Sequence, residues 1–226
     1  QVLDQGVDLK KWKPENYGKK FYGPSTLRVG LEKSRNLMTV RIAQNLGVDK
    51  VAKFSKDLKI YDNPEELLSI SLGSAETTLL NLTSAYSSFV NGGKLISPII
   101  IYRIQDSEGN TIINNENRKC MNCDKISYTG KDYPQIEDNY EQVMSEQTAY
   151  QVTTILEGVI KRGTGKKLRD LQLNLAGKTG TTNENTDAWF IGFTSNLVIG
   201  VYVGMDNPKP LGKFETGSKA ALPIFR

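Results

Sequence analysis

The spacing of apolar residues changes along the chain, and this change constrains the fold more than any other feature of the sequence. Over the first two thirds, apolar residues recur mainly every three or four positions, which is typical of amphipathic helices. The last third instead contains short apolar runs separated by short polar links, which indicates an antiparallel meander of strands. Helices followed by a hairpin, one more helix and a run of strands favour an α+β fold over alternating βαβ units.

Capping residues and glycines mark the ends of the expected elements. Asp49 and Ser145 are good helix caps, and Gly47 can end a helix in a left-handed conformation. In the helix that Asp49 begins, we expect Val51 and Phe54 to face inward. The expected helices are 26–33, 38–46, 49–58, 77–90 and 145–161, the expected strands are 98–103, 111–113, 173–181, 188–194 and 197–203, and a turn is expected over 106–110.

The chain has 226 residues, a length that suits one large domain with a sizeable buried core. Within it, residues 114–144 are polar, acidic and poorly periodic, and we expect them to form a surface loop or insertion. The net charge is +4 and the basic residues are scattered, a pattern that argues against nucleic-acid binding. The longest aliphatic run, Ile99–Ile101, is far shorter than the about 18 residues that a membrane span needs.

The sequence contains no histidine. This absence excludes a Ser-His-Asp triad, a Cys-His pair and any metal site with histidine ligands, so any covalent chemistry must use another base. The two cysteines, Cys120 and Cys123, cannot supply the four ligands of a zinc site by themselves, and we expect neither metal nor another cofactor. Their Cys-Met-Asn-Cys spacing is compatible with a local disulfide and with two free thiols.

The segment most suited to ligand binding or catalysis is 177–182, Gly-Lys-Thr-Gly-Thr-Thr. Its first three residues resemble the end of a phosphate-binding Walker A loop. That pattern requires glycine at position 172, which is glutamine here, and the triplet lies in strand-like sequence rather than before a helix. A phosphate-binding loop is therefore disfavoured.

On its own chemistry, this segment suits an extended ligand that carries a carboxylate. The ammonium of Lys178 and the hydroxyls of Thr179 and Thr181 can meet a carboxylate, while Gly180 lets a ligand approach the backbone closely. An exposed strand edge can also pair with a peptide by β-augmentation. The alternative interpretation is an ordinary edge strand with a solvated lysine.

A second candidate is Ser34-Arg35-Asn36, at the junction of two expected helices. Side chains at such a junction can project from a tight loop toward a site. The alternative is that Ser34 and Asn36 only cap helices, which both residue types do well.

Together with their surroundings, these segments resemble the transpeptidase domain of class A penicillin-binding proteins. The matching motifs follow the family order from about Trp12 to Pro223, which is nearly the whole chain. They are Trp12-x-Pro14-x-Asn16-Tyr17, Gly23-Pro24-Ser25-Thr26-Leu27-Arg28, Leu31-x-x-Ser34-x-Asn36, Leu72-Gly73-Ser74-x-Glu76-Thr77, Ala85-Tyr86, Asn91-Gly92-Gly93, Gly163-Thr164-Gly165, Ala176 to Thr182, and Asp187-Ala188-Trp189-Phe190-x-Gly192.

The resemblance implies a serine β-lactamase-like fold, in which an antiparallel sheet packs with a helical subdomain. It also implies serine acyl transfer on the D-Ala-D-Ala end of a peptidoglycan stem peptide, with transpeptidase or carboxypeptidase outcome and inhibition by penicillins. Ser34 would relay protons toward the leaving amine, and Asn36 would hold the substrate amide. Lys178, Thr179 and Thr181 would bind the terminal carboxylate, and the backbone N–H of Thr181 would complete an oxyanion hole.

One family motif has no counterpart, because no serine of the sequence is followed by lysine three residues later. We expect this Ser-x-x-Lys nucleophile, a membrane anchor and a glycosyltransferase domain upstream in a longer parent protein, at the periplasmic face of a bacterial inner membrane. Both ends of the domain are then expected to be incomplete, and the chain is expected to be inactive alone. The alternatives are a non-catalytic peptidoglycan-binding module and a serine β-lactamase.

Overall fold

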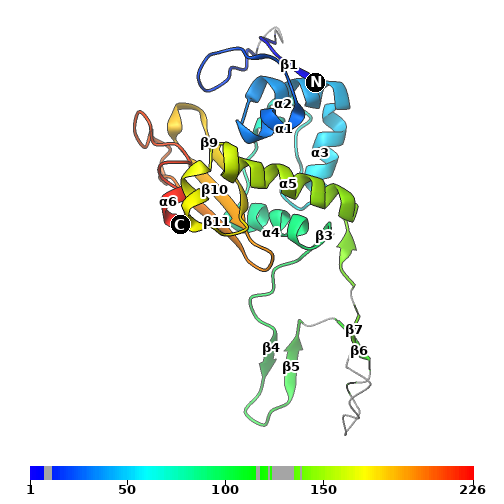
Figure 1. Ribbon diagram of the computed structural model, residues 1–226. Helices are drawn as coiled ribbons and strands as arrows, with labels where there is room; N and C mark the ends of the chain where they lie inside the picture. The colour runs from blue at the N-terminus through cyan, green and yellow to red at the C-terminus, as the bar shows by residue number, and fades with distance from the viewer. Residues whose placement is uncertain (8–11, 116–117, 122, 124–134, 138) are drawn as a thin grey trace.

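The computed structural model describes residues 1–226 except 8–11, 116–117, 122, 124–134 and 138. Helices and antiparallel strands are both present in this part of the chain, which confirms the predicted α+β class. Figure 1 shows a body that holds both termini and a narrow arm that projects from it. The body contains the two candidate segments, so its packing decides their geometry.

The body is built on a three-stranded antiparallel sheet, as the spacing in the last third of the sequence predicts. Its strands are β9 (Ala176–Thr181), β10 (Ala188–Phe193) and β11 (Val198–Val203), in the spatial order β11-β10-β9. Among the described strands, none pairs with the outer side of β9, which is therefore an edge. β9 begins later than the expected residue 173, because Leu173 is exposed and follows the 3₁₀ turn η2 (Lys166–Leu171).

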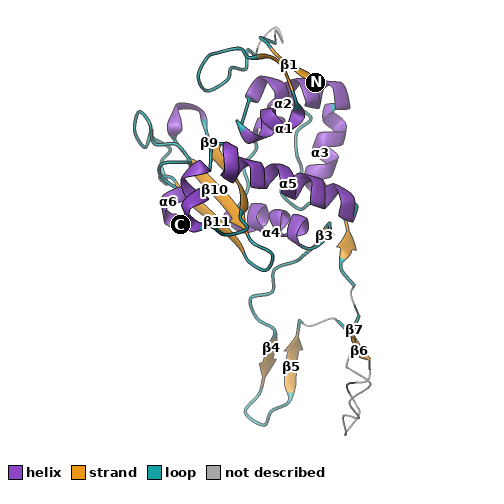
Figure 2. Ribbon diagram, viewed as in Figure 1, coloured by secondary structure: helices purple, strands orange, loops and turns teal. Residues whose placement is uncertain are grey.

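Helices cover both faces of this sheet. The helices α4 (Leu79–Val90) and α5 (Glu146–Arg162) lie on one face, and the short α6 (Leu222–Phe225) lies on the other (Figure 2). Side chains alternate along a strand, so Phe193 packs toward α4 and α5 whereas Phe190 packs toward α6. Full burial of one such side chain contributes roughly 1.5–3 kcal/mol.

The remaining helices of the body precede the sheet in the sequence. Local capping explains where several of them begin: Thr26, Thr78 and Ser145 accept hydrogen bonds from backbone N–H groups of the first turns of α1, α4 and α5. The predicted Ser145 cap is thereby confirmed. The other elements before the sheet are α1 (Leu27–Glu32), α2 (Asn36–Leu46), α3 (Val48–Asp57) and η1 (Leu68–Leu72), and η3 (Asn183–Asn185) joins β9 to β10.

Two predictions about α3 are wrong. Asp49 does not cap this helix, because Gly47, with φ +101°, both ends α2 and provides the cap position of α3. Asp49 instead lies in the first turn, where its charge still suits the positive end of the helix dipole. Phe54 is 42% exposed, because Ala52 is the buried residue of the helix and Phe54 lies about 200° around the axis from it.

The arm is made of short antiparallel strand pairs. The expected turn over 106–110 is present, and Asp106 accepts hydrogen bonds from the backbone N–H groups of Glu108 and Asn110. The arm carries β4 (Arg103–Gln105) paired with β5 (Thr111–Asn114), and β6 (Cys120–Met121) paired with β7 (Gln135–Ile136). The other two pairs outside the main sheet are β1 (Val2–Asp4) with β2 (Gly23–Ser25) and β3 (Lys94–Leu95) with β8 (Glu141–Gln142).

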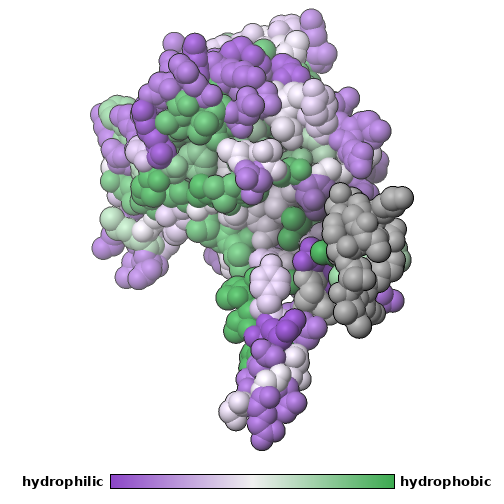
Figure 3. All heavy atoms as spheres, turned by 60° about the horizontal axis from the view of Figure 1, so that its bottom comes forward, coloured by the Kyte–Doolittle hydropathy of each residue, from purple (hydrophilic) through white to green (hydrophobic). Residues whose placement is uncertain are grey.

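The strand predicted over 98–103 is wrong, since β4 begins only at Arg103, opposite Asn114. Ile99 to Ile101 favour extended backbone, but no described strand pairs with them, and Ile100 is 86% exposed. Figure 3 looks toward the end from which the arm projects, with hydrophobic side chains near its root and hydrophilic ones at its tip.

Parts of the predicted surface loop 114–144 lie outside the described residues. The described part includes β6, β7 and β8, and a disulfide joins Cys120 to Cys123, which decides between the two alternatives for these cysteines. Within the described residues, we find no helix whose length and apolar character would let it cross a bilayer.

Candidate active site

Ser34 lies in the tight connection between α1 and α2. Its backbone is left-handed, with φ +53°, a conformation that is uncommon for a residue with a side chain. The N–H of Ser34 donates to the carbonyl of Leu31, and the N–H of Arg35 donates to the carbonyl of Gly30. Ser34 is thus the middle residue of a three-residue connection that is held to the end of α1 by backbone hydrogen bonds.

Lys178, on β9, meets this hydroxyl directly. Its Nζ donates to Ser34 Oγ at 2.7 Å and to the carbonyl oxygen of Thr179 at 2.8 Å. Burial lowers the pKa of Lys178 to about 8, because the charged ammonium loses water in this position. The structure therefore brings together the two predicted segments, which are 144 residues apart in the sequence.

The outer edge of β9 presents backbone groups beside this lysine. Thr182 N–H donates to the Asp187 carbonyl at 3.1 Å, so Thr182 bonds inward, toward β10. In an antiparallel ladder the bonding direction alternates, which turns the backbone groups of Thr181, Thr179 and Gly177 outward. The bond from Lys178 to the Thr179 carbonyl agrees with this alternation.

The two threonine hydroxyls of β9 each have a partner in the structure. Thr179 Oγ1 lies 2.7 Å from Thr164 Oγ1, and Thr181 Oγ1 accepts from the N–H of Gly217 at 3.0 Å. The Gly217 segment lies tightly on the strand, since a Cβ added there would be 2.4 Å from the carbonyl oxygen of Gly180. These contacts fix the positions of both hydroxyls.

Asn36, the other predicted residue of the first segment, opens α2. Its Nδ2 donates to the backbone carbonyl of Glu15 at 2.9 Å. The structure therefore joins Ser34 to Lys178, and Asn36 to the segment around Glu15. Neither side chain caps α2, whose cap position, Arg35, makes no side-chain bond. The left-handed backbone of Ser34 does end α1, so the helix-cap interpretation holds for this backbone but does not account for the side-chain bonds of Ser34 and Asn36.

A polar network under the α1–α2 connection was not predicted. Asn16 Oδ1 accepts from the N–H of Leu37 at 3.3 Å, and its Nδ2 donates to Asp4 Oδ1 at 2.7 Å. Arg35 lies 3.7 Å from the fully buried Asp4 carboxylate and donates to Ser25 Oγ at 2.6 Å. Asn16 belongs to a motif that the resemblance singles out, whereas nothing in the sequence marks Asp4.

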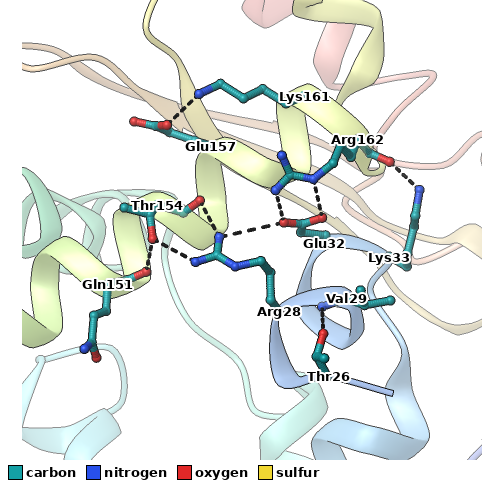
Figure 4. A network of polar contacts seen from close by, with 10 residues as sticks. All are labelled: Thr26, Arg28, Val29, Glu32, Lys33, Gln151, Thr154, Glu157, Lys161 and Arg162. Atoms are coloured by element: carbon teal, nitrogen blue, oxygen red, sulfur yellow. Dashed lines mark hydrogen bonds and ion pairs between the residues drawn. The ribbon is translucent and has the colours of Figure 1, made fainter. Parts of the chain in front are cut away.

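A second network holds α1 against α5 and is drawn in Figure 4. Arg162 donates two hydrogen bonds to the carboxylate of Glu32, at 3.1 and 2.5 Å. This pairing raises the pKa of Arg162. Sequence reasoning missed both residues, because a buried carboxylate looks like any helix-surface glutamate in a single sequence.

The geometry defines what this site can bind. A lysine ammonium, two threonine hydroxyls and outward N–H groups all belong to β9, whose outer edge is unpaired among the described strands, and such a strand suits an extended chain ending in a carboxylate. Within the described residues, no group of three or more His, Cys, Asp or Glu side chains is placed to hold a metal ion.

Comparison with known proteins assigns this architecture to a family. The model of the penicillin-binding protein transpeptidase domain matches residues 2–226. Penicillin-binding protein 1A of Rickettsia bellii is 44% identical over 99% of this chain, and that of Pseudomonas aeruginosa is 32% identical over 99%. The chain spans 28% and 31% of the lengths of these two curated relatives.

Solved structures agree with the sequence matches. The crystal structure of penicillin-binding protein 1A from Haemophilus influenzae superimposes with a TM-score of 0.82 and 31% identity, over 96% of this chain and 36% of that one. PonA1 of Mycobacterium tuberculosis shares the fold at a TM-score of 0.78 and 21% identity, over 99% of this chain and 60% of that one. The family match covers nearly the whole chain, so the chain belongs to the penicillin-binding protein transpeptidase domain family.

Proposed function

We propose that this chain is part of a serine D,D-transpeptidase that cross-links peptidoglycan stem peptides. The observation that carries the proposal is the bond from Lys178 to Ser34 at the free edge of β9. Family membership and the named relatives support it. The parent protein acts on the D-Ala-D-Ala end of a stem peptide at the periplasmic face of the inner membrane, and carboxypeptidase activity is its hydrolytic side reaction.

The donor peptide binds as an extra strand along β9. Its terminal carboxylate meets the Lys178 ammonium and the hydroxyls of Thr179 and Thr181, whose present partners are weak neutral groups that a charge-assisted bond can replace. Gly180 leaves room for the peptide to approach the strand. β-Lactams carry a carboxylate in the equivalent place, and a neighbour of the same fold, PonA1, was solved in complex with penicillin V.

Acyl transfer needs a nucleophile, a proton path and an oxyanion site. The nucleophile is a serine of a Ser-x-x-Lys motif outside this sequence, since the sequence contains no such motif. Ser34, bonded to Lys178, relays a proton to the leaving amine of D-alanine, and Asn36 holds the substrate amide. The N–H of Thr181, which the ladder alternation turns outward, stabilises the oxyanion of the tetrahedral intermediate.

A turnover assay on the full-length protein tests this function. Stem peptides that end in D-Ala-D-Ala are supplied with an acceptor amine, and free D-alanine and cross-linked product are measured. Release of D-alanine with formation of the cross-link is expected, and penicillin should abolish both. Binding of the peptide without release of D-alanine would overturn the proposal and favour a non-catalytic binding module.

A further inference from the structure

The bond between Ser34 and Lys178 joins two separate layers of the body. Ser34 belongs to the α1–α2 connection, whereas Lys178 belongs to β9, whose inner face packs on α5. The distance between the two atoms therefore depends on how α1 is held against α5. The last residue of α1, Glu32, lies two positions before Ser34 and contacts α5.

Glu32 is a buried carboxylate held by positive charge. It is only 3% exposed, yet it accepts two hydrogen bonds from Arg162 and lies 3.9 Å from the guanidinium of Arg28. Arg28 also donates to the backbone carbonyl and the hydroxyl of Thr154 on α5, at 2.9 and 3.2 Å. Figure 4 shows these side chains converging between the two helices, with Lys33 donating to the Arg162 carbonyl beside them.

Helix α5 and the turn after it are shaped to receive Glu32. A Cβ added at Gly158 would lie 1.9 Å from Glu32 Oε1, and one added at Gly163 would lie 2.2 Å from the Glu32 carbonyl oxygen. Two glycines thus leave the space that the carboxylate and the carbonyl fill. A side chain at Gly163 would meet the backbone of Glu32 and push α1 away from α5, whereas one at Gly158 would displace the Glu32 carboxylate.

The backbone of Glu32 continues the connection to β9. The N–H of Thr164 donates to the Glu32 carbonyl at 3.3 Å, and the Thr164 hydroxyl is bonded to the Thr179 hydroxyl at 2.7 Å. Thr179 is the neighbour of Lys178 along the strand. Glu32 is therefore connected to Ser34 through the end of α1, and to Lys178 through Thr164 and Thr179.

The Glu32–Arg162 ion pair is a weak source of stability, because burial removes the Glu32 carboxylate from water while the half-exposed Arg162 remains hydrated. Its fixed two-bond geometry, however, restricts how the two helices can move relative to each other. We propose that Glu32 and Arg162 are positioning residues that fix the separation between Ser34 Oγ and Lys178 Nζ, and hence the rate of acyl transfer. This inference rests on the proposed function.

The test compares Glu32→Gln with the unaltered full-length protein, in separate measurements of penicillin binding and of the following acylation step. The carboxylate-binding groups of β9 remain in place, so the binding constant should change by less than about threefold. Acylation needs the Ser34–Lys178 alignment and should slow by about tenfold, a change that corresponds to about 1.4 kcal/mol. Arg162→Gln should give the same pattern, and the double variant should be no slower than either single variant.

Two further variants separate positioning from folding. Arg162→Lys keeps a cation near Glu32 but loses the two-bond geometry, and it should give an intermediate rate. Glu157→Gln is the matched control, because it removes the ion pair of Glu157 with Lys161 on the same helix, and it should change both constants by less than about twofold.

The outcomes distinguish the two proposals. If the unaltered protein is not acylated, the proposed function fails. If it is acylated and Glu32→Gln lowers thermal stability while the acylation rate of the folded protein stays the same, Glu32 is structural only and the positioning proposal is wrong. Arg162→Lys, which retains the ion pair, gives the same decision if Glu32→Gln does not fold.

Discussion

Apolar side chains are buried in the body of this molecule but exposed in its arm. In the body, Val159 and Phe190 are 0% exposed, because helices cover both faces of the sheet. In the arm, Ile112 of β5 is 65% exposed, because the single strand pair β4–β5 has no second layer to cover it. Ile100, just before this pair, is 86% exposed. Apolar side chains are therefore buried only where layers from distant parts of the sequence meet, and the candidate site lies where two such layers meet.

The largest difference between the two regions is expected when one lysine in each, Lys178 in the body and Lys119 in the arm, is replaced by alanine. Lys178→Ala should slow penicillin acylation of the full-length protein by about 10- to 200-fold, because a charge-assisted hydrogen bond contributes about 1.5–3 kcal/mol. Lys119→Ala, in the exposed arm, should change the rate by less than about twofold. Second-order acylation rates decide, with circular dichroism to check folding. A folded Lys178→Ala protein that is acylated at the normal rate would falsify the carboxylate role of Lys178.

The second prediction concerns pH. The pKa of Lys178 is lowered to about 8, so the ammonium is present below pH 8 and is lost as pH rises through that value. Acylation by a carboxylate-bearing β-lactam should therefore fall above pH 8, by at most about tenfold per unit. Lys178→Arg should be slower at pH 7, because a guanidinium is larger and planar, but its rate should stay flat to pH 10. A parallel decline in both proteins would mean that another group titrates.

A pair of glycine substitutions compares the packing of the two regions. Gly163→Ala should lower the free energy of unfolding by about 3 kcal/mol, because its Cβ would lie 2.2 Å from the Glu32 carbonyl oxygen, on backbone that cannot move aside. Gly109→Ala in the arm meets nothing within 4 Å, and only its φ of +89° opposes the change. It should cost about 1 kcal/mol, confined to the hairpin. Denaturant unfolding measures the free energy of unfolding of both variants. Equal losses of stability would show that Gly163 is no more tightly packed than Gly109.

The last prediction concerns the arm disulfide, whose loss should leave the body unaffected. Replacing Cys120 and Cys123 together by serine should change the free energy of unfolding by at most about 2 kcal/mol, because the closed loop is very short. The acylation rate should not change. A larger loss of stability, or a slower acylation, would show that the arm supports the body.

The body could be predicted from the sequence better than the arm. The spacing of apolar residues predicts α5 and the β9–β10–β11 meander well, since α5 buries one continuous stripe and β10 is a short apolar run buried on both faces. The isoleucines at 99–101 lead to a wrong strand prediction, because an extended segment becomes a strand only where another strand pairs with it. The prediction that Phe54 faces inward is wrong for a similar reason, since segments elsewhere in the chain decide which face of α3 is covered.

The candidate site could be predicted only in part. Lys178 and Ser34 stand out because they occur in motifs with unusual turn and strand chemistry. Glu32 and Asp4 do not stand out, because their significance comes from burial, which arises from contacts between distant segments. Arg162 does not stand out either, because its significance comes from its pairing with Glu32, 130 residues away in the sequence. Asn36 belongs to a recognisable motif, but its bond to the Glu15 carbonyl is visible only in three dimensions.

Mapping the covalent penicillin adduct tests the central claim most directly, because the claim divides labour between this chain and a nucleophile outside it. The full-length protein is labelled with fluorescent penicillin, digested and analysed by mass spectrometry, alongside the isolated 226-residue chain. The adduct should lie on the serine of a Ser-x-x-Lys motif upstream of these residues, and the isolated chain should remain unlabelled. A stable adduct on Ser34, or on any other serine of this sequence, would contradict the claim.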